Sequence, residues 1–346
     1  MIVFDQLELE QLITHQVGSH SQDEGTRLST AATQIPDATL EHLYAYLLHP
    51  FKSQEQFHFA HTTELELNPV YALVHSLFAN PGALAELSGK LCQLLYQASN
   101  HPKVAAGQFH VALFTGAIVG DEEVRAIGLF KTETSEPFLR AHLSQKHFEI
   151  DHLMGTPIDS LDKGCLIVQS ESADGYRILL VDTLGRGQPA QYWRGDFLGA
   201  KTVADEYEHT REYLSMAKQF VTRNLPAEFD TDRPAQAEML NKSIAYFKEN
   251  DTFDQQEFAE TVFEHSNMRQ AFTDYKREYQ AERAQPLPDE FGISEMAVKQ
   301  QAKGFKSVIK LDANFHIYVH GAREYIERGT DAEGRKFYKL YYMEEK

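Results

Sequence analysis

The sequence predicts an α+β protein, and three observations lead to that fold class. Apolar residues recur at helical spacing between residues 37 and 98, whereas residues 109–182 contain short stretches with the two-residue period of strands. The helical period returns over residues 203–282, and further strand-like stretches follow it. Because helices precede and follow the strands and do not alternate with them, an antiparallel sheet is favoured over a doubly wound parallel one.

Three helices are predicted in the N-terminal part, after about 25 residues in which helix and strand signals are mixed. The first begins at Asp37, a capping residue that is followed by an apolar face at helical spacing. The second begins at Asn68 and Pro69, a cap with proline at the first helical position. A Pro-Gly break then precedes a third helix over residues 84–98.

Four strands are predicted after these helices, in two pairs. The first pair covers residues 109–115 and 124–131, and the intervening Gly-Asp-Glu-Glu at 120–123 is a turn signal. The second pair covers residues 165–169 and 176–182, with a turn that ends in glycine between them. Such spacing is typical of hairpins, so an antiparallel sheet is expected here.

A mainly helical region follows the strands. Residues 203–221 carry apolar side chains in alternating steps of four and three, and this stripe packs internally or forms a dimer. Thr202 with Asp205, and Thr252 with Gln255, have the spacing of a capping box. Asn-Leu-Pro at 224–226 is expected to end the first helix. Three shorter helices are predicted after it, over residues 235–249, 253–264 and 267–282.

The C-terminal part is predicted to be rich in strands. Pro-Leu-Pro at 286–288 is the clearest linker signal in the chain, and residues 329–334 read as a turn. Strand-like stretches occupy residues 305–311, 315–320 and 336–342. In the middle one, alternation turns Phe315, Ile317 and Val319 to one side. It turns the polar and aromatic residues Asn314, His316, Tyr318 and His320 to the other side.

These elements divide the chain into three predicted parts. Residues 1–195 form an α+β domain, residues 196–290 a helical region, and residues 291–346 a small β-rich region. A chain of 346 residues is long enough for two or three such parts.

The charge is unevenly distributed. The chain has 51 acidic and 33 basic residues, a net charge of −18, which excludes a protein that coats DNA with its whole surface. Residues 301–346 differ, with nine basic and seven acidic residues. If any part of the chain meets a polyanion, we expect it to be this segment, because the rest repels nucleic acid.

No metal or cofactor is predicted. The sixteen histidines do not form a His-Glu-x-x-His motif, and no glycine-rich phosphate-binding loop occurs. Two cysteines cannot form a disulfide framework or a zinc site. The chain lacks an apolar run of about 18 residues and a signal peptide, so a cytoplasmic protein is expected.

One group of residues could be catalytic. Glu122, Glu123, Lys131 and Glu133 flank a predicted hairpin, and carboxylates beside a lysine can hold Mg²⁺ next to a phosphodiester, as in nucleases. The spacing fits such a motif poorly, and a solvated hairpin face is the favoured interpretation.

The C-terminal segment provides the candidate nucleic-acid-binding residues. Basic groups bind phosphates and aromatic faces stack on bases. The candidates are Lys306, Lys310, His316, Tyr318, His320, Arg323, Lys336 and Lys339. They alternate with the aromatic residues Phe305, Tyr325, Tyr338, Tyr341 and Tyr342. The alternative is a small sheet with an aromatic inner face and a polar outer face.

Several short motifs resemble the bacterial nucleoid-associated protein family of NdpA or YejK-like proteins. The C-terminal motifs are SVIKLDANFHIY at 307–318, GARE at 321–324 and RKFYKLYY at 335–342. FDQLELEQLI at 4–13 is similar to the opening of that family, and DFLGA at 196–200 to its central motif. The resemblance implies a cytoplasmic, nucleoid-associated protein and brings no cofactor or catalytic residue with it.

The leading hypothesis is therefore a non-enzymatic nucleoid-associated protein. Its expected partner is DNA or RNA, contacted directly or through a DNA-processing protein that binds the acidic surface. The first alternative is a protein–protein interaction module without nucleic-acid contact, and the second is the metal-dependent nuclease. The sequence does not fix the oligomeric state, and a homodimer is one option.

Overall fold

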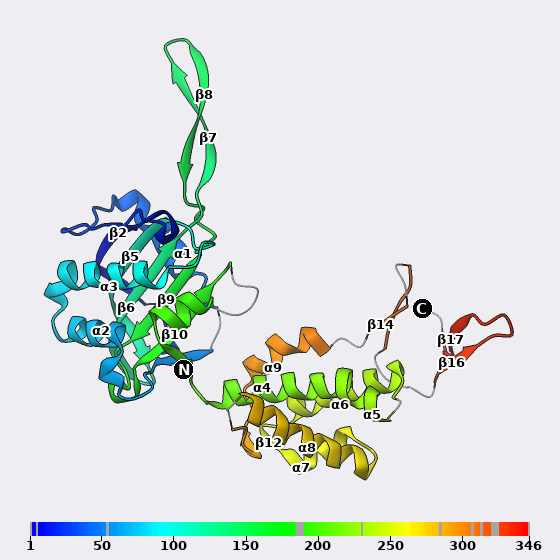
Figure 1. Cartoon of the computed structure of the whole chain (residues 1–346). Coiled ribbons are helices and arrows are strands. Elements are labelled where there is room, and N and C mark those ends of the chain that lie inside the picture. The colour runs from blue at the N-terminus through cyan, green and yellow to red at the C-terminus, as the bar shows by residue number, and fades with distance from the viewer. Residues whose placement is uncertain are drawn as a thin grey trace. The chain divides into compact units, whose positions relative to one another are not determined.

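The computed structural model forms two compact units, Met1–Val203 and Ala204–Lys346 (Figure 1). It describes residues 2–4, 6–52, 55–184, 190–229, 231–283, 286–305, 308–311, 314–319 and 325–344. The predicted α+β class is confirmed, since helices and antiparallel sheets make up both units. No helix in these ranges combines the length and apolar character that crossing a membrane requires.

A nine-stranded antiparallel sheet forms the centre of the first unit. Its order is β11-β4-β10-β9-β6-β5-β2-β3, and β1 also pairs with β5. The four predicted strands are its central members β5, β6, β9 and β10. The bounds are β1 Ile2–Val3, β2 Glu8–Val17, β3 Thr26–Arg27, β4 Gln56–Phe59, β5 Gly107–Val119, β6 Glu122–Thr132, β9 Lys163–Val168, β10 Arg177–Asp182 and β11 Ala200–Thr202. The ambiguous N-terminal stretch is thus a strand, β2, paired along most of its length with β5.

Both faces of this sheet are buried. Val111 and Leu113 of β5 belong to the core that α2 (Pro69–Ala79) and α3 (Leu84–Ala98) cover. The alternate residues Ala112 and Phe114 belong to a second core, which α1 (Asp37–Leu48) covers. Burial on both sides explains why the central strands read as nearly continuous apolar runs.

The N-terminal helices begin close to their predicted starts. Asn68 caps α2 as expected, because its Oδ1 accepts hydrogen bonds from the backbone N–H groups of Val70 and Tyr71, both at 3.0 Å. The predicted cap of α1 is wrong. Pro36 occupies the capping position and Asp37 lies in the first turn. There its negative charge still favours the positive end of the helix dipole.

A long β-hairpin, here called the arm, leaves the sheet between β6 and β9. It consists of β7 (Glu136–Ser144) and β8 (His147–Gly155), which pair only with each other. Figure 1 shows it projecting from the body of the first unit. No strand was predicted for these residues, so the arm is a feature that only the structure revealed.

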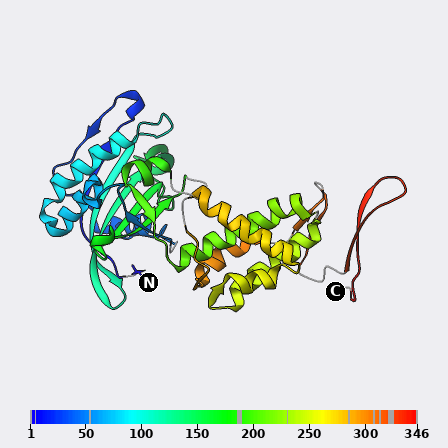
Figure 2. The same ribbon diagram turned by 60° about the horizontal axis from the view of Figure 1, so that its bottom comes forward.

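The second unit is built around packed helices (Figure 2). They are α4 Glu206–Gln219, α5 Leu225–Phe229, α6 Arg233–Glu249, α7 Gln255–Val262, α8 Ser266–Arg283 and α9 Glu295–Gln301. Leu214, Ala217 and Val221 are fully buried, so the apolar stripe of the first helix packs internally. The expected end at residues 224–226 is wrong, because a π-helical turn over Phe220–Asn224 carries the chain from α4 into α5.

Neither predicted capping box forms. Asp205 caps α4 by accepting from the N–H of Glu208 at 3.0 Å, and Thr202 lies in β11 instead. In the same way, Asp254 caps α7, while Thr252 lies in a short strand. In both places an aspartate two or three residues after the threonine supplies the carboxylate that the first helical N–H groups need.

Three two-stranded antiparallel sheets are described in the second unit. β12 (Thr252–Asp254) pairs with β13 (Glu290–Gly292), and the bounds of the others are β14 Val308–Lys310, β15 His316–Tyr318, β16 Ile326–Thr330 and β17 Lys336–Leu340. β16 ends where a turn was expected, and Ala302–Phe305 is a 3-10 helix where a strand was expected to start. Leu287, Val298 and Phe305 lie in the same core as α4, so the structure groups the predicted second and third parts in one compact unit.

Candidate nucleic-acid interface

The eight candidate residues fall on two C-terminal hairpins and on positions outside the described ranges. His316 and Tyr318 lie on β15, and Lys336 and Lys339 lie on β17. The backbone of Lys310 belongs to β14, directly opposite His316, but its side chain is not among those described. The candidates that lie outside the described residues are Lys306, His320 and Arg323.

The β14–β15 hairpin is anchored to α6. Ile309 and Val319 are buried against Ala237 of that helix, and Asn241 Nδ2 donates a hydrogen bond to the carbonyl oxygen of Val319 at 3.2 Å. Neighbouring residues along a strand point alternately towards α6 and towards solvent. Tyr318, on the opposite face from Ile317 and Val319, is 62 % exposed.

Phe315 departs from the predicted pattern. It was expected to point inward with Ile317 and Val319, but it is 62 % exposed. β15 begins only at His316, so Phe315 lies before the strand and its alternation does not apply. Phe305, in contrast, was expected among the surface aromatic residues and is buried in the helical core.

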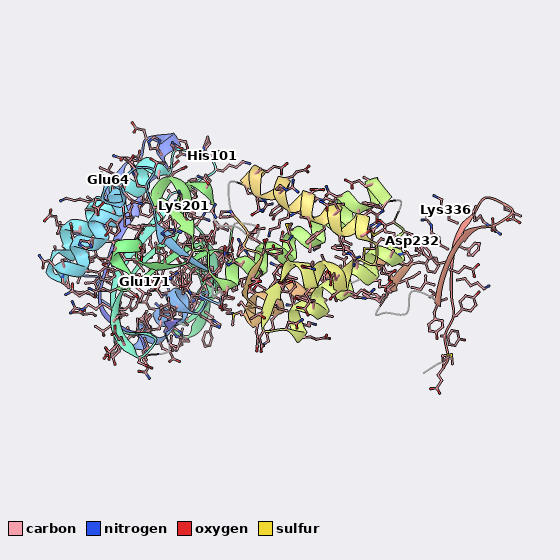
Figure 3. All side chains as sticks on the ribbon, turned by 90° about the horizontal axis from the view of Figure 1, so that it is seen from below. Glu64, His101, Glu171, Lys201, Asp232 and Lys336 are labelled. Carbon is pink, nitrogen blue, oxygen red and sulfur yellow. The ribbon has the colours of Figure 1, made fainter. Side chains whose placement is uncertain are left out.

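The β16–β17 hairpin carries two cations, Arg328 and Lys336, for which the described residues provide no ion-pair partner. Arg328 lies opposite Tyr338 and Lys336 opposite Thr330, so alternation places both cations on one face of the ribbon. Tyr338 and Ile326 pack against the small core beneath β14–β15. Within the described ranges neither Arg328 nor Lys336 has an ion-pair partner, and the side chain of Lys336 extends from the ribbon in Figure 3.

Lys339 differs from Lys336 because it has an ion-pair partner. Its Nζ lies 3.5 Å from Glu327 Oε2 and 4.9 Å from the centre of the Tyr341 ring. Glu327 also accepts a hydrogen bond from the hydroxyl of Tyr341 at 2.8 Å. That bond, with the charge of Lys339, lowers the pKa of Glu327. The charge of Lys339 is therefore partly neutralised by Glu327.

Exposed rings accompany these cations. Tyr325, Tyr341 and Tyr342 are exposed, Tyr342 at 72 %. Together with Tyr318 they offer aromatic faces to which bases could stack. Arg328 was not among the sequence candidates, and no strand was predicted between residues 320 and 336. The alternation Ile326-Glu327-Arg328 was the signal that could have revealed β16.

The predicted nuclease group is not assembled. Glu122 and Glu123 lie at the start of β6, and Lys131 lies eight residues later on the same strand, about 26 Å away. Lys131 and Glu133 are also buried, so the alternative of a solvated hairpin face is wrong for this pair. A single divalent cation cannot contact both ends of a strand of this length.

Lys131 instead belongs to a buried ionic cluster at the base of the arm. Its Nζ lies 3.1 Å from Glu133 Oε1, and Lys163 Nζ lies 2.6 Å from Asp182 Oδ1. Both ammonium groups approach the ring of Tyr192, at 5.2 and 5.9 Å from its centre, and the Tyr192 hydroxyl donates to Glu133. Burial lowers the pKa of Lys131, and the nearby carboxylate of Glu133 opposes that shift.

Asp162 completes this base. It is fully buried, and its Oδ2 accepts from the backbone N–H groups of Glu133 and Thr134 at 2.6 and 2.7 Å. Its Oδ1 accepts from the Thr134 hydroxyl at 2.7 Å. These are the residues from which the chain enters β7. The cluster thus fixes the arm on the sheet by satisfied buried charges, an arrangement that is structural in character.

Comparison with known proteins identifies the family to which the chain belongs. No curated protein matches the chain significantly. The family model described as nucleoid-associated protein YejK (NA37) matches residues 13–333, nearly the whole chain and both structural units. The chain therefore belongs to this family of nucleoid-associated proteins.

Proposed function

We propose that this protein is a non-enzymatic nucleoid-associated protein that contacts DNA through its two C-terminal hairpins, β14–β15 and β16–β17. Family membership supports an association with the nucleoid. One observation supports direct contact. On a strongly acidic chain, Arg328 and Lys336 of the β16–β17 hairpin have no ion-pair partner within the described ranges, and exposed tyrosines lie on the same C-terminal segment.

The small number of such cations sets the expected strength of binding. A site with three or four phosphate contacts loses about one to two decades of affinity between about 50 and 200 mM salt, because counterions released from DNA drive the association. Repulsion from the acidic remainder of the chain weakens binding at low salt, and because salt screens this repulsion, it offsets part of that salt dependence. Weak, non-specific and strongly salt-dependent binding is therefore expected.

The test is a salt titration of the full chain with a short fluorescent DNA duplex. A truncation before residue 290 is unsuitable, because it would remove Val298 and Phe305 from the helical core. Lys336→Ala should weaken binding and reduce the salt slope by about one contact. Its neighbour Arg335 provides the matched control, since Asp331 and Glu333 already bind its guanidinium at 2.7 and 2.8 Å.

Arg335→Ala should therefore change affinity much less than Lys336→Ala. Equal effects of the two substitutions would count against a phosphate contact at Lys336. Absence of binding even at low salt would refute direct contact, and the acidic surface would then be the place to look for a DNA-bound protein partner.

RNA and single-stranded DNA are compared with the duplex in the same assay. Tyr318→Ala should weaken binding to unpaired strands by about 1–3 kcal/mol if a base stacks on its ring, whereas Tyr318→Phe should not. Tighter binding of RNA than of duplex DNA would change the proposed ligand but not the proposed surface.

A further inference from the structure

The two faces of the arm differ sharply in chemistry. In an antiparallel ribbon, residues directly opposite each other point to the same face, and neighbours along a strand alternate between faces. The register pairs Leu139 with His152, Ala141 with Ile150, and Leu143 with Phe148. These pairs and their neighbours make up the apolar arm face, which consists of Pro137, Leu139, Ala141, Leu143, Phe148, Ile150, His152 and Met154.

The opposite face of the arm carries an arginine–aspartate ion pair and contacts between histidines and carboxylates. Arg140 and Asp151 lie opposite each other, with 2.6 Å between Nη2 and Oδ2. His147 Nε2 lies 3.0 Å from Glu149 Oε1, and His142 lies between Glu149 and Asp151. Phe138 and Leu153 also lie on that face, but they are only 44 and 49 % exposed and stand beside the paired Arg140 and Asp151, so this face presents less apolar surface than the apolar arm face.

The apolar arm face has no such partner within the described part of the chain. Its five large apolar side chains are between 61 and 82 % exposed. Together they present roughly 600 Å² of apolar surface, at the upper end of what a typical monomer leaves in one patch. A ribbon that projects from the fold and leaves one apolar face in water is therefore incomplete by itself.

We propose that the apolar arm face binds the same face of a second copy of this chain, forming a homodimer with twofold symmetry. Two copies would bury roughly 1,200 Å², which reaches the size of the smaller stable interfaces. The surface is self-complementary, because no Asp, Glu, Lys or Arg lies on it and an isologous contact brings no like charges together.

Charge favours the arm over other parts of the molecule as the place of contact. Two copies that each carry −18 repel each other, but residues 136–155 contain three acidic and two basic residues only. Nucleic acid fits the apolar arm face poorly, since the face offers no cation and Arg140, on the opposite face, is engaged by Asp151. This inference is independent of the proposed nucleic-acid contact.

The buried base of the arm supports the same conclusion. Asp162 and the Lys131 and Lys163 ion pairs hold the residues that lead into β7, so the ribbon is positioned before it meets a partner. A preorganised element loses less conformational entropy on binding than a loose loop does. An interface of modest area can then still be stable.

The test measures the mass of the full chain in solution by sedimentation equilibrium at micromolar concentration. The wild type should have twice the monomer mass of 39.4 kDa. Ile150→Lys places a cation in the centre of each face and should raise the dissociation constant at least about tenfold. The matched control, His142→Lys, adds the same charge on the opposite face one register pair away, and it should remain dimeric.

Salt gives a second readout with a definite sign. Raising the ionic strength screens repulsion between the acidic copies and leaves an apolar contact intact, so dimerisation should strengthen. A wild type that remains monomeric overturns the proposal, whatever other protein the arm binds. A dimer that both substitutions leave intact, or that salt dissociates, also overturns it, because the contact must then lie elsewhere.

Discussion

The arm β7–β8 and the C-terminal hairpin β16–β17 are both exposed two-stranded ribbons, but their side chains suit different partners. One face of the arm is apolar and lacks Lys and Arg, while Arg140 and Asp151 form an ion pair on the other face. The C-terminal hairpin mixes tyrosines with Arg328 and Lys336 on a short ribbon. The same backbone pattern thus underlies both proposals, a protein contact in one unit and a polyanion contact in the other, and the residues that alternate make the difference.

The bases of the two ribbons also differ. The arm is held by buried charges, among them Asp162 and Lys163. The C-terminal hairpin contacts a small apolar cluster through Ile326 and Tyr338. Removing a buried charge leaves its partners unsatisfied, whereas removing a half-buried apolar contact loses only part of its transfer free energy. The arm should therefore be more sensitive to substitution at its base.

The largest effect on stability is expected for a substitution at the base of the arm. Asp162→Ala leaves the buried N–H groups of Glu133 and Thr134 without an acceptor and Lys131 with less compensating charge. The free energy of unfolding of the first unit should fall by about 3–5 kcal/mol. Urea unfolding followed by the fluorescence of Trp193, the only tryptophan and fully buried in that unit, measures the change.

Asp159→Ala is the control for that measurement, because Asp159 is an exposed carboxylate in the same loop. Its substitution should change the free energy of unfolding by less than about 0.5 kcal/mol. If the two alanine variants are equally stable, the cluster does not hold the arm in the way described.

The second expected effect is a dependence of the stability of the first unit on pH. Burial lowers the pKa of His110 on β5 from 6.5 to about 4, and the charge of His15 contributes further. The unfolded chain therefore binds this proton at a higher pH than the folded chain, so stability is lost as the pH falls from 6.5 towards 4. The loss is about 1.4 kcal/mol per pH unit and at most about 3 kcal/mol in total.

His110→Gln should remove that part of the pH dependence, measured by Trp193 fluorescence in urea across the same pH range. The comparison with the wild type isolates His110 from other groups, including His15, whose pKa is also lowered by burial. A variant with the same pH profile as the wild type would show that His110 is protonated without cost in the folded state.

The smallest effect is expected for a substitution on the C-terminal hairpin that releases Lys339 from its carboxylate partner. Glu327→Gln removes the carboxylate that engages Lys339 and Tyr341. Lys339 then becomes available to phosphate, and affinity for duplex DNA at low salt should rise about threefold, with a steeper salt dependence. The control Glu333→Gln removes the same charge, but Arg335 stays bound to Asp331. Equal gains from both would indicate a general charge effect and no release of Lys339.

Much of the fold could be predicted because its signals are local. Apolar spacing located α2, α3 and the central strands, and Asn68 with Pro69 marked a helix start. Capping was predicted less well. A threonine and an aspartate occur close together at the starts of α4 and α7. Only the folded structure shows which of the two side chains accepts hydrogen bonds from the N–H groups of the helix. The arm was missed because the sequence His152-Leu153-Met154 interrupts its alternation.

The candidate interface could be predicted only in part. Composition identified the C-terminal segment as the basic one, and alternation placed His316 and Tyr318 together on the outer face. Composition could not distinguish Lys336 from Lys339, since an ion pair with Glu327 depends on cross-strand register. The proposed contact at Lys336 remains a prediction for the salt titration to test.

The sequence by itself determined the periodic elements, the acidic body and the mildly basic C-terminal segment, because these depend on neighbouring residues and on charge counts. Tertiary structure alone decided that Lys131 is buried and that the apolar side of the arm is exposed. The reason is physical. Lys131 is stable in the interior because Glu133 pairs with it and because the pairing of β6 with β9 brings Asp162, the residue before β9, close to it. The arm stays in water because neither of its strands pairs with the sheet that would have covered it.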